Sequence, residues 1–491
     1  MPGASRLLTI AYAVFLFGVA AYFVPAATWN PVSRFDLTRA IVEGRTLSID
    51  RFVENTGDRS FRGGHWYTDK APIPSLLAVP TYAAFHAVES RRGHRPEYSV
   101  FSTRETPALR VTVNRAFEQG LYVASLSTAG LGMAVLGVLL FRVLERRTTR
   151  LGALFGSAGV ALATPLLPYS TSFYGHGVAA AFLTGAWAAL FEDPDSPPST
   201  ARIRVAGACI ALAAGSEYLA LLPGAALALT FLASRPRAAW LSGAMDLALG
   251  AVAPASVVAL YHTVCFGAPH HTGYSFLVRP EFAAGHASGL MGLHLPTRAG
   301  LHGLLLSQNR GLFVLAPVAL PALIGLADLA RRDAAARAAL AAFVVLLLAN
   351  AGYYMWWGGA AAGPRHLVPA MPFLALGLSR LWDGPFRWVA ALLALVSFAN
   401  VLVLTAVGLE APDRGSLLFD YAYARFLRGE LASLSGAENL GIRLGLARGA
   451  SLGPILVWVL LGGRFLVRLA LEPEDTGAEP DSAEVAPSAP A

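Results

Sequence analysis

Charge is scarce in this sequence. Only 14% of its 491 residues are Asp, Glu, Lys or Arg, whereas 55% are hydrophobic, and the mean hydropathy is +0.52. A soluble globular domain carries about 25% charged residues, so most of this chain has no polar face to present to water. The composition excludes a soluble globular enzyme and indicates a protein whose solvent is the hydrocarbon of a bilayer.

Cysteine and lysine are also nearly absent. Cys209 and Cys265 lie in or beside apolar runs, which excludes a disulfide framework and a thiolate metal site. Lysine occurs only at Lys70, although Lys and Arg together number 38. An arginine bias of this kind is typical of a GC-rich genome, so the single lysine is of interest. No residue pattern indicates a cofactor, and none supports a divalent cation.

Apolar runs recur from end to end and predict about 12 membrane-spanning helices. They lie at residues 6–26, 116–142, 151–168, 178–191, 205–215, 218–234, 240–264, 311–330, 338–355, 366–381, 388–409 and 451–467. The predicted fold class is all-α: a polytopic transmembrane helical bundle over residues 1–471. Its large first external loop, residues 27–115, is expected to contain amphipathic interfacial helices.

Arginine placement predicts the orientation. Clusters at 146–150, 202–204, 235–237, 331–337 and 464–468 share one side if the spans alternate, and positive charge favours the cytoplasm. Both termini are then cytoplasmic, in a bacterial inner membrane, and the acidic, Pro- and Ala-rich residues 472–491 form a disordered tail. Residues 27–115, 169–177, 265–310, 356–365 and 410–450 face outward. The short, proline-bounded stretch 72–88 is expected to lie in the interface or re-enter rather than cross.

The first external loop opens with a predicted amphipathic helix. Within residues 33–43, Asp36, Arg39 and Glu43 share one helical face and apolar side chains the other, as in a helix on the membrane surface. Asp36 follows Ser33 by three residues, which is the spacing of a capping box. It is equally a candidate catalytic carboxylate, and the pattern leaves both roles open.

A polar, aromatic and glycine-containing stretch follows in the same loop. Its candidate site residues are Asp58, His65, Tyr67, Asp69 and Lys70. Lysine binds phosphate as a point charge, and the glycines at 63 and 64 could let the backbone approach a ligand. The structural alternative is that aromatic residues anchor the loop at the interface and Asp69 pairs with Lys70. Taken alone, the stretch favours this alternative.

Further candidates lie near the external ends of later apolar runs. They are polar or aromatic residues: His176, Glu217, Arg310, Trp357, Arg365 and His366. External arginine runs against the positive-inside bias, so Arg310 and Arg365 are expected to contact lipid phosphate or to hold a specific anion. Glu217 lies at a predicted turn, where an acid is either solvated among the headgroups or functional.

Residues 36–72 resemble the first external loop of the GT-C superfamily of membrane glycosyltransferases, especially its protein O-mannosyltransferase-like and lipid A aminoarabinose transferase-like members. The matches are Asp36-x-x-Arg39, Gly44 and Gly64-x-x-Tyr67-x-Asp69-Lys70-Ala71-Pro72. Looser matches continue at 173–176, 266–267, 310–311 and 363–365. The chain departs from the family pattern at Ala71, where the motif has proline, and at Leu37, where it has a second acid.

The resemblance implies an inverting transfer of a sugar from a polyprenyl-phosphate carrier to an acceptor hydroxyl on the external, periplasmic face. Asp36, or Asp58 as its alternative, would remove the acceptor's proton. Lys70, Arg310 and Arg365 would stabilise charge on the departing phosphate, which leaves without protonation. The implied partners are the lipid-linked sugar donor, a lipid, glycan or protein acceptor, and the bilayer.

Two other function classes fit a chain with many spans. One is a transporter or flippase that moves a lipid-linked solute; the other is a non-catalytic partner in envelope assembly. A transporter places its charges near the bilayer midplane between two matching halves with broken spans. Here the candidate residues gather on one side, which favours an enzyme over a transporter.

Overall fold

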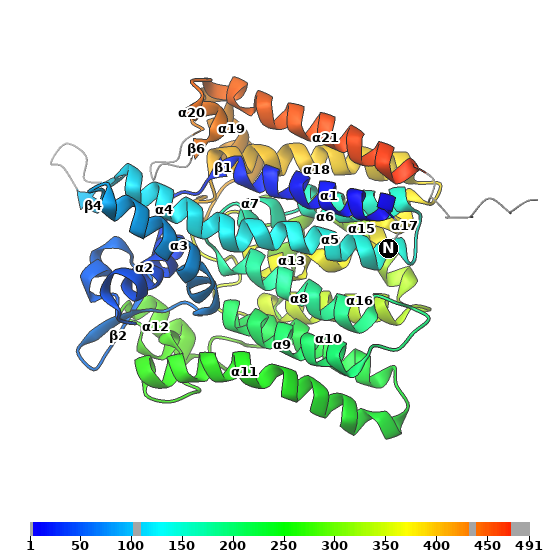
Figure 1. Cartoon of the computed structure of the whole chain (residues 1–491), viewed down its shortest axis with the longest axis horizontal. Helices are drawn as coiled ribbons and strands as arrows, with labels where there is room; N and C mark the ends of the chain where they lie inside the picture. Colours follow the sequence, from blue (N-terminus) through cyan, green and yellow to red (C-terminus); the bar gives the residue numbers. More distant parts are fainter. Residues whose placement is uncertain (1–2, 102–109, 432–437, 473–491) are drawn as a thin grey trace, which may run out of the picture.

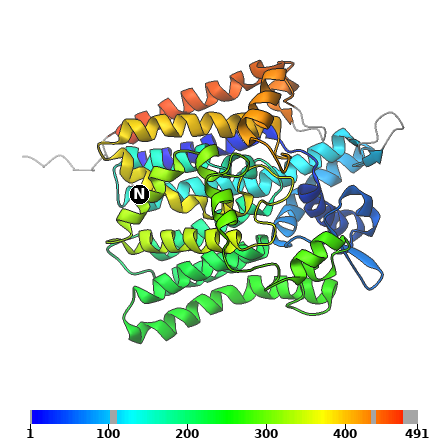
Figure 2. The same ribbon diagram turned by 180° about the vertical axis from the view of Figure 1, so that it is seen from behind.

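The computed structural model describes residues 3–101, 110–431 and 438–472, so the predicted disordered tail lies outside the described residues except for Glu472. Long helices run roughly side by side and form a bundle (Figures 1 and 2). In chain order they are α1 (Gly3–Ala21), α4 (Arg115–Ser125) continuing through η2 (Leu126–Gly130) into α5 (Leu131–Glu145), α6 (Arg150–Ala163), α8 (Gly175–Phe191), α9 (Thr200–Ser216), α10 (Leu221–Ala233), α11 (Trp240–Phe266), α15 (Ala319–Leu329), α16 (Ala334–Ala351), α17 (Ala375–Trp382), α18 (Arg387–Val407) and α21 (Gly453–Leu471).

Shorter elements connect these helices. They are β1 (Phe23–Val24), α2 (Trp29–Gly44), η1 (Asp50–Asn55), β2 (Arg59–Arg62), β3 (His65–Thr68), α3 (Ile73–Arg91), β4 (Tyr98–Phe101), β5 (Arg110–Val113), α7 (Leu166–Ser170), η3 (Tyr218–Ala220), η4 (Arg237–Ala239), η5 (Gly273–Phe276), α12 (Pro280–Ala287), α13 (Arg298–Leu305), α14 (Leu312–Leu315), η6 (Arg365–Leu374), η7 (Leu417–Ala422), α19 (Tyr423–Arg428), β6 (Glu438–Asn439), α20 (Leu440–Arg443) and η8 (Arg448–Leu452). Within the described residues, the strands pair as two-stranded antiparallel ribbons, β1 with β6, β2 with β3 and β4 with β5. The fold is therefore helical apart from these ribbons.

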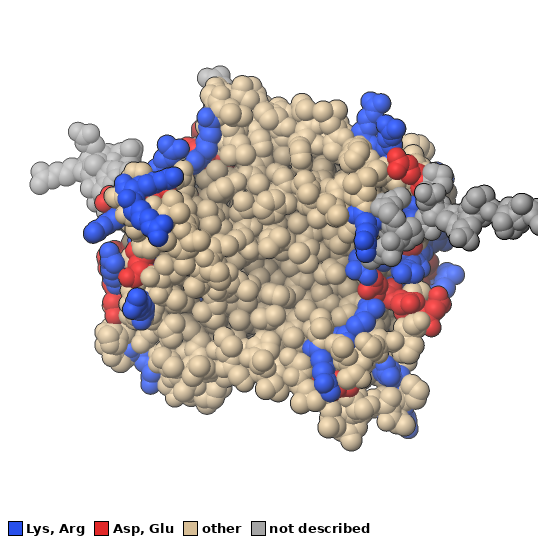
Figure 3. Space-filling view, in the orientation of Figure 1, with Lys and Arg blue, Asp and Glu red and all other residues tan. Residues whose placement is uncertain are grey.

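On the face seen in Figure 3, a broad surface without charge lies between two charged rims. Five helical stretches within the described residues are long and apolar enough to cross a membrane: 115–145, 237–266, 334–351, 387–407 and 449–471. Five shorter apolar helices accompany them. This supports a multi-pass membrane protein, and each of the twelve predicted runs carries helix. The exact number of spans stays a prediction.

Proline interrupts two of the runs that were predicted as continuous helices. The run 311–330 divides into α14 and α15 around Pro317, and the run 366–381 begins as the 3₁₀ segment η6, which contains Pro369 and Pro372. Proline lacks the N–H that a helix interior needs, and it clashes with the preceding turn. Two irregular segments therefore lie where the sequence predicted regular helix.

The arginine-rich turns meet at one end of the bundle, as predicted. Arg147, after α5, pairs with Asp333 before α16 at 3.1 Å and donates to the carbonyl of Phe191 at the end of α8. Asp383, after α17, accepts a 2.9 Å bond from the backbone N–H of Thr149. The beginning of α1 and the end of α21 lie at this same end (Figure 1). That this end faces the cytoplasm stays a prediction.

The β2–β3 hairpin lies at the opposite end with α2, α3 and α12 (Figure 1). Gly63 and Gly64 form its two-residue turn with φ of +60° and +86°, a conformation that glycine adopts without steric cost. Both glycines have open space around them, so their role is the turn and not a close approach to a ligand. Arg59 pairs with Thr68 at the open end of the hairpin. Asp58, which precedes Arg59, and Asp69, which follows Thr68, therefore lie at the base of the hairpin.

Helix α2 differs from the predicted surface helix. It begins at Trp29 rather than near Ser33, and it is buried along most of its length. The Ser33 hydroxyl bonds the Asp58 carbonyl at 2.6 Å and the Thr68 hydroxyl at 2.6 Å, so Ser33 and Asp36 lie inside the helix and form no capping box. The polar face of α2, which was predicted to be exposed to solvent, is instead packed against the rest of the first loop.

The topology gives a direct labelling prediction. Ser90 is exposed near the end of α3, and Ser196 is exposed in the turn between α8 and α9 at the opposite end of the bundle. In a chain lacking Cys209 and Cys265, Ser90→Cys is expected to react with an impermeant thiol reagent in intact cells. Ser196→Cys should react only after permeabilisation. The reverse pattern would show that the assigned orientation is inverted.

Candidate active site

A cavity of about 580 Å³ opens at the end of the molecule that carries α2, α3 and the β2–β3 hairpin. Its wall draws residues from the outward-facing segments predicted at 27–115, 169–177, 265–310, 356–365 and 410–450. They include Asp58, Asp69, Lys70, Tyr174, His176, Tyr274, Arg279, Glu281, His286, Trp357, Arg365, Glu410 and Asp413, together with Glu217, Tyr353, Tyr354 and His366. Segments far apart in the sequence thus form one polar chamber at one end of an apolar bundle.

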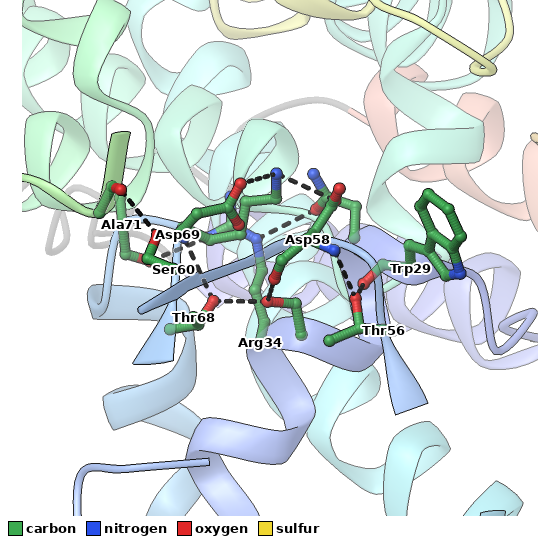
Figure 4. Close-up of polar contacts among 12 residues, drawn as sticks. Trp29, Arg34, Thr56, Asp58, Ser60, Thr68, Asp69 and Ala71 are labelled. Atoms are coloured by element: carbon green, nitrogen blue, oxygen red, sulfur yellow. Dashed lines mark hydrogen bonds and ion pairs between the residues drawn. The ribbon is translucent and has the colours of Figure 1, made fainter. Parts of the chain in front are cut away.

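Lys70 lies between two carboxylates on one side of this cavity. Its Nζ is 2.9 Å from Asp58 Oδ2 and 3.1 Å from Asp69 Oδ2 (Figure 4). Burial opposes the charge on Lys70, but the two carboxylates outweigh it and raise its pKa. Burial raises the pKa of Asp69 to about 6, against the pull of Lys70. Lys70 is therefore a cation. It lies beside two acids, and its single positive charge can neutralise one of them.

The position of Asp58 is fixed from α2. Its backbone N–H donates to Thr56 Oγ1 at 3.0 Å, and the Thr56 hydroxyl in turn donates to the carbonyl of Trp29 at 2.9 Å (Figure 4). The Ser33 hydroxyl holds the Asp58 carbonyl. The side chain remains 16% exposed while it pairs with Lys70. These contacts present the Asp58 carboxylate to the cavity from a fixed backbone.

Arg365 enters the same cavity at the start of η6. Within the described part of the chain it forms no direct ion pair, and its Nε is buried without a hydrogen-bond partner. Gly358 packs directly against it: the backbone there has φ of +80°, and a Cβ would lie 2.9 Å from Arg365 Nε. A cation held close by backbone but left without a counter-ion is suited to binding an anion.

His176 and Glu217 line the cavity, and the buried Arg34 pairs with Glu217 from outside the lining. Arg34 NH2 is 2.6 Å from Glu217 Oε1, and His176 Nδ1 is 3.5 Å from the same oxygen. Arg34 also donates to the carbonyl of Ala71 at 2.8 Å, beside Lys70. A Cβ at Gly175 would collide with Glu217 Oε1, so only glycine allows the acid to approach the first turn of α8.

Aromatic rings line another part of the wall. His286 stacks on Tyr274 with ring centres 4.2 Å apart, and Tyr353 OH lies 3.2 Å from His286 Nε2. Tyr354 meets the same imidazole edge-on at 5.1 Å, and Trp357 also lines the cavity. Such a wall offers flat apolar faces with polar edges, which suits a ligand that is partly apolar and partly hydroxylated.

The cavity includes many of the residues singled out in the sequence, but not all of them. Those in its wall are Asp58, Asp69, Lys70, His176, Glu217, Trp357, Arg365 and His366. His65 instead pairs with Asp50 at 2.7 Å near the hairpin turn, and the ring of Tyr67 packs on Phe266 at 5.6 Å. Asp36 and Arg310 also lie outside the lining.

Arg310 is fully buried and directed at backbone. Its guanidinium donates to the carbonyls of Trp357 at 2.9 Å, Gly359 at 2.9 Å and Pro412 at 3.3 Å, and its remaining ion pair, with Asp413, is 3.5 Å long. These bonds tie two outer segments together behind the cavity wall. Arg310 therefore positions the loop that carries Trp357 and is not free to hold a phosphate.

We expect Arg310→Ala to act first on stability. Removing the guanidinium leaves buried carbonyls without donors, and each unsatisfied buried group costs about 1–3 kcal/mol. The thermal unfolding midpoint of the purified variant should fall clearly. Arg310→Lys should recover only part of the loss, because an ammonium cannot span several carbonyls as a planar fork does. An unchanged midpoint with weakened phosphate binding would instead make Arg310 a ligand-binding residue.

Asp36 is fully buried and does not line the cavity. Its Oδ1 accepts a 3.0 Å bond from Asn55 Nδ2 and lies 3.6 Å from Arg39, while its Oδ2 has no hydrogen-bond partner in the part of the chain that the structure describes. Arg39 is itself bound by Glu43 at 2.8 Å. Burial raises the pKa of Asp36 to about 8, although Arg39 and the Asn55 amide pull it down. Near neutral pH the carboxyl is therefore largely protonated.

This shift predicts how Asp36 affects stability with pH. The carboxyl loses its proton near pH 4 in the unfolded chain and near pH 8 in the folded one. Between these values a rising pH favours the unfolded state, and above them the penalty is constant. The unfolding midpoint of Asp36→Asn, relative to wild type, should therefore rise between about pH 5 and about pH 8. An offset independent of pH would mean that Asp36 is ionised throughout.

Several wall residues were not identified from the sequence. Arg34, which pairs with the wall residue Glu217, lies two residues before Asp36 in the helix that the sequence predicted at the membrane surface. Tyr274, Arg279 and His286 lie in the segment after α11, where the sequence shows no motif. Within residues 3–101, 110–431 and 438–472 no group of three His, Cys, Asp or Glu side chains could hold a metal ion.

Comparisons with known proteins bear on the fold. No protein-family model and no curated protein matches the sequence. The Archaeoglobus fulgidus oligosaccharyltransferase complex with zinc and sulfate superposes with a TM-score of 0.50 and 14% identity, covering 83% of this chain and 54% of that one. The same enzyme tethered to an acceptor peptide with an NVT sequon gives 0.50 and 12%, over 81% and 54%.

This chain thus spans about half the length of the archaeal enzyme. Cupriavidus metallidurans ArnT bound to undecaprenyl phosphate is 14% identical, with a TM-score of 0.49 over 95% of this chain and 74% of that one. The likeness to the archaeal enzyme is one of fold, and it agrees with the resemblance found in the first external loop. The chain shares its fold with the part of the archaeal oligosaccharyltransferase that it covers.

Proposed function

We propose that this protein transfers a sugar from a polyprenyl-phosphate carrier to an acceptor hydroxyl, with inversion, on the periplasmic face of a bacterial inner membrane. The observation that carries the proposal is one cavity that presents the Asp58 carboxylate beside two cations, Lys70 and Arg365, at the polar end of an apolar bundle. A lipid phosphate lies at this level of a bilayer while its tail stays among the helices.

The residues of the cavity divide the reaction between them. The Asp58 carboxylate accepts the acceptor's hydroxyl proton as that oxygen attacks the anomeric carbon, and the bond from that carbon to the phosphate oxygen breaks. Lys70 and Arg365 stabilise the negative charge left on the carrier phosphate. No acid is required at the leaving group, because a phosphate departs as a stable anion. The aromatic wall formed by Tyr274, His286 and Tyr353 faces the sugar.

A flippase of lipid-linked solutes is the main alternative. Such a protein needs its polar groups near mid-membrane, where both compartments can reach them in turn. Here the charged groups of the cavity belong to segments at one end of the bundle, outside the uncharged surface seen in Figure 3. This arrangement supports chemistry at one face rather than transport across it.

The test is a transfer assay on the full chain in proteoliposomes. Membranes supply the lipid-linked donor for this assay. In a second experiment, mass spectrometry compares envelope glycolipids and glycoproteins between the parent and a deletion strain. The proposal predicts loss of one sugar modification in the deletion strain, its return with the wild-type chain, and no return with Asp58→Asn. Movement of a lipid-linked sugar across the membrane without any new glycosidic bond would favour the flippase.

A further inference from the structure

The inner part of the cavity is electrically neutral before a ligand enters. Asp58, Asp69, Glu217, Lys70 and Arg365 line this part, and Arg34, outside the lining, pairs with Glu217, so three acids meet three bases. The side chains in the ion pairs are at most 16% exposed. An incoming phosphate would therefore add one or two negative charges that the existing ions do not offset, and an uncompensated buried charge is expensive.

Two imidazoles in this wall can supply the missing charge. His176 is 2% exposed, and neither ring nitrogen has a hydrogen-bond partner among the described residues. The Nε2 atom of His366 is also buried without a partner, and the two rings meet edge to face with centres 5.5 Å apart. Buried polar atoms are almost always paired in native proteins. Unpaired nitrogens beside Arg365 Nε, which is also unpaired, indicate that a ligand completes this wall.

The surroundings of the imidazole pair favour a proton arriving together with an anion. His176 Nδ1 lies 3.5 Å from Glu217 Oε1, which can accept its proton in a hydrogen bond. Against this, burial lowers the pKa of His176, and repulsion from Arg365, Arg34 and Lys70 lowers it further. The rings of Tyr169, Tyr174 and Tyr353 pack against the pair and stay neutral. Burial opposes protonation of both rings, and an anion that offsets the three cations removes the repulsion that adds to it.

We propose that the carrier phosphate binds together with about one proton, which the His176–His366 pair takes up from solvent and holds beside Glu217. This inference rests on the proposed function. Before transfer the carrier is a phosphodiester with one negative charge, and the phosphate left after transfer is a monoester with up to two. The protonated pair donates to the phosphate oxygens as that charge grows, and it returns its proton to solvent when the carrier leaves.

The probe is inorganic sulfate, which does not titrate near neutral pH, added to the full chain in nanodiscs. Calorimetry in two buffers of different ionisation enthalpy measures protons taken up, and a pH series measures affinity. If one proton is taken up with each sulfate, the affinity for sulfate falls up to tenfold for each unit by which the pH rises. In His176→Gln/His366→Gln, sulfate should still bind through Lys70 and Arg365, but weakly and without this pH dependence.

Controls separate the imidazole pair from its rivals. His302 is exposed on α13 and does not line the cavity, so His302→Gln should keep the wild-type slope. Asp69 is the main rival proton acceptor, because burial already raises its pKa to about 6. His286 is the other rival proton acceptor, and burial lowers its pKa to about 4. Proton uptake that survives in the double variant and disappears in Asp69→Asn or His286→Gln would overturn the proposal.

The remaining outcomes are also decisive. Sulfate that binds the wild-type chain without proton uptake overturns the inference and leaves the proposed function standing. No binding of sulfate, nor of undecaprenyl phosphate in the same nanodiscs, removes the phosphate site and the proposed function with it. If the double variant does not fold, His176→Gln and His366→Gln are measured singly, and each should reduce the slope. An unchanged slope in both would exclude the pair.

Discussion

Asp58→Asn is expected to lower the rate of sugar transfer by roughly 10²–10⁴ while the protein stays folded, because an amide cannot accept the acceptor's proton. The substitution keeps the size of the side chain, and the backbone contacts from Ser33 and Thr56 do not involve the carboxylate. Lys70 retains Asp69 as its partner at 3.1 Å. Turnover by the purified variant, with its thermal midpoint measured beside it, checks the prediction.

Two matched variants give this result its meaning. Glu281 is an acid in the wall of the same cavity, but its side chain is 61% exposed, so Glu281→Gln should keep most of the activity. Asp36→Asn tests the other carboxylate of the first loop, which is buried outside the lining. If Asp58→Asn and Asp36→Asn both turn over at the wild-type rate, the loop-carboxylate mechanism is wrong. Glu217 or a substrate-assisted route would then be the alternatives.

The sequence predicted the architecture because that architecture depends on one-dimensional patterns. Apolar runs locate the helices, and arginine clusters place their turns on one side. Arg147, Asp333 and Thr149 show how closely those turns meet. The predicted outward-facing segments then had to share one end, and they do form one cavity. Breaks at Pro317 and within η6 show where local backbone chemistry modified the pattern.

The site was predicted less completely, because a pattern does not show which side chains are already occupied. Arg310 and Arg365 look alike in the sequence: each lies in an outer segment at the end of an apolar run. In the fold, Arg310 is bonded to backbone carbonyls, whereas Arg365 is directed into the cavity with its Nε unpaired. Only three-dimensional contacts distinguish a positioning arginine from one available to a ligand.

Asp36 illustrates the same limit. The spacing of Asp36 relative to Ser33 and Arg39 predicted a surface helix with a solvent-exposed polar face. On such a helix Asp36 would be either a capping residue or a catalytic acid. The helix instead starts at Trp29 and is covered by the first loop, so Asp36 belongs to a buried network with Asn55. Helical periodicity identified the face correctly, but it could not show whether water or protein covers that face.

Lys70 is expected to contribute the second large effect. A desolvated contact between a cation and phosphate contributes about 1.5–3 kcal/mol, so Lys70→Ala should weaken carrier binding and turnover by roughly tenfold or more. Lys70→Arg should restore only part of this, because a planar fork does not reproduce a point charge between Asp58 and Asp69. Binding of undecaprenyl phosphate in nanodiscs and turnover in proteoliposomes are the two measurements.

Removing Lys70 also leaves Asp58 and Asp69 facing each other without a cation, and two adjacent carboxylates cannot both ionise easily. Loss of activity could then come from a protonated Asp58 rather than from lost phosphate binding. The double variant Lys70→Ala/Asp69→Asn separates these causes, since it restores a single carboxylate. If Lys70 binds phosphate, carrier binding stays weak in the double variant; if binding returns to the wild-type value, the lysine serves only to keep Asp58 ionised.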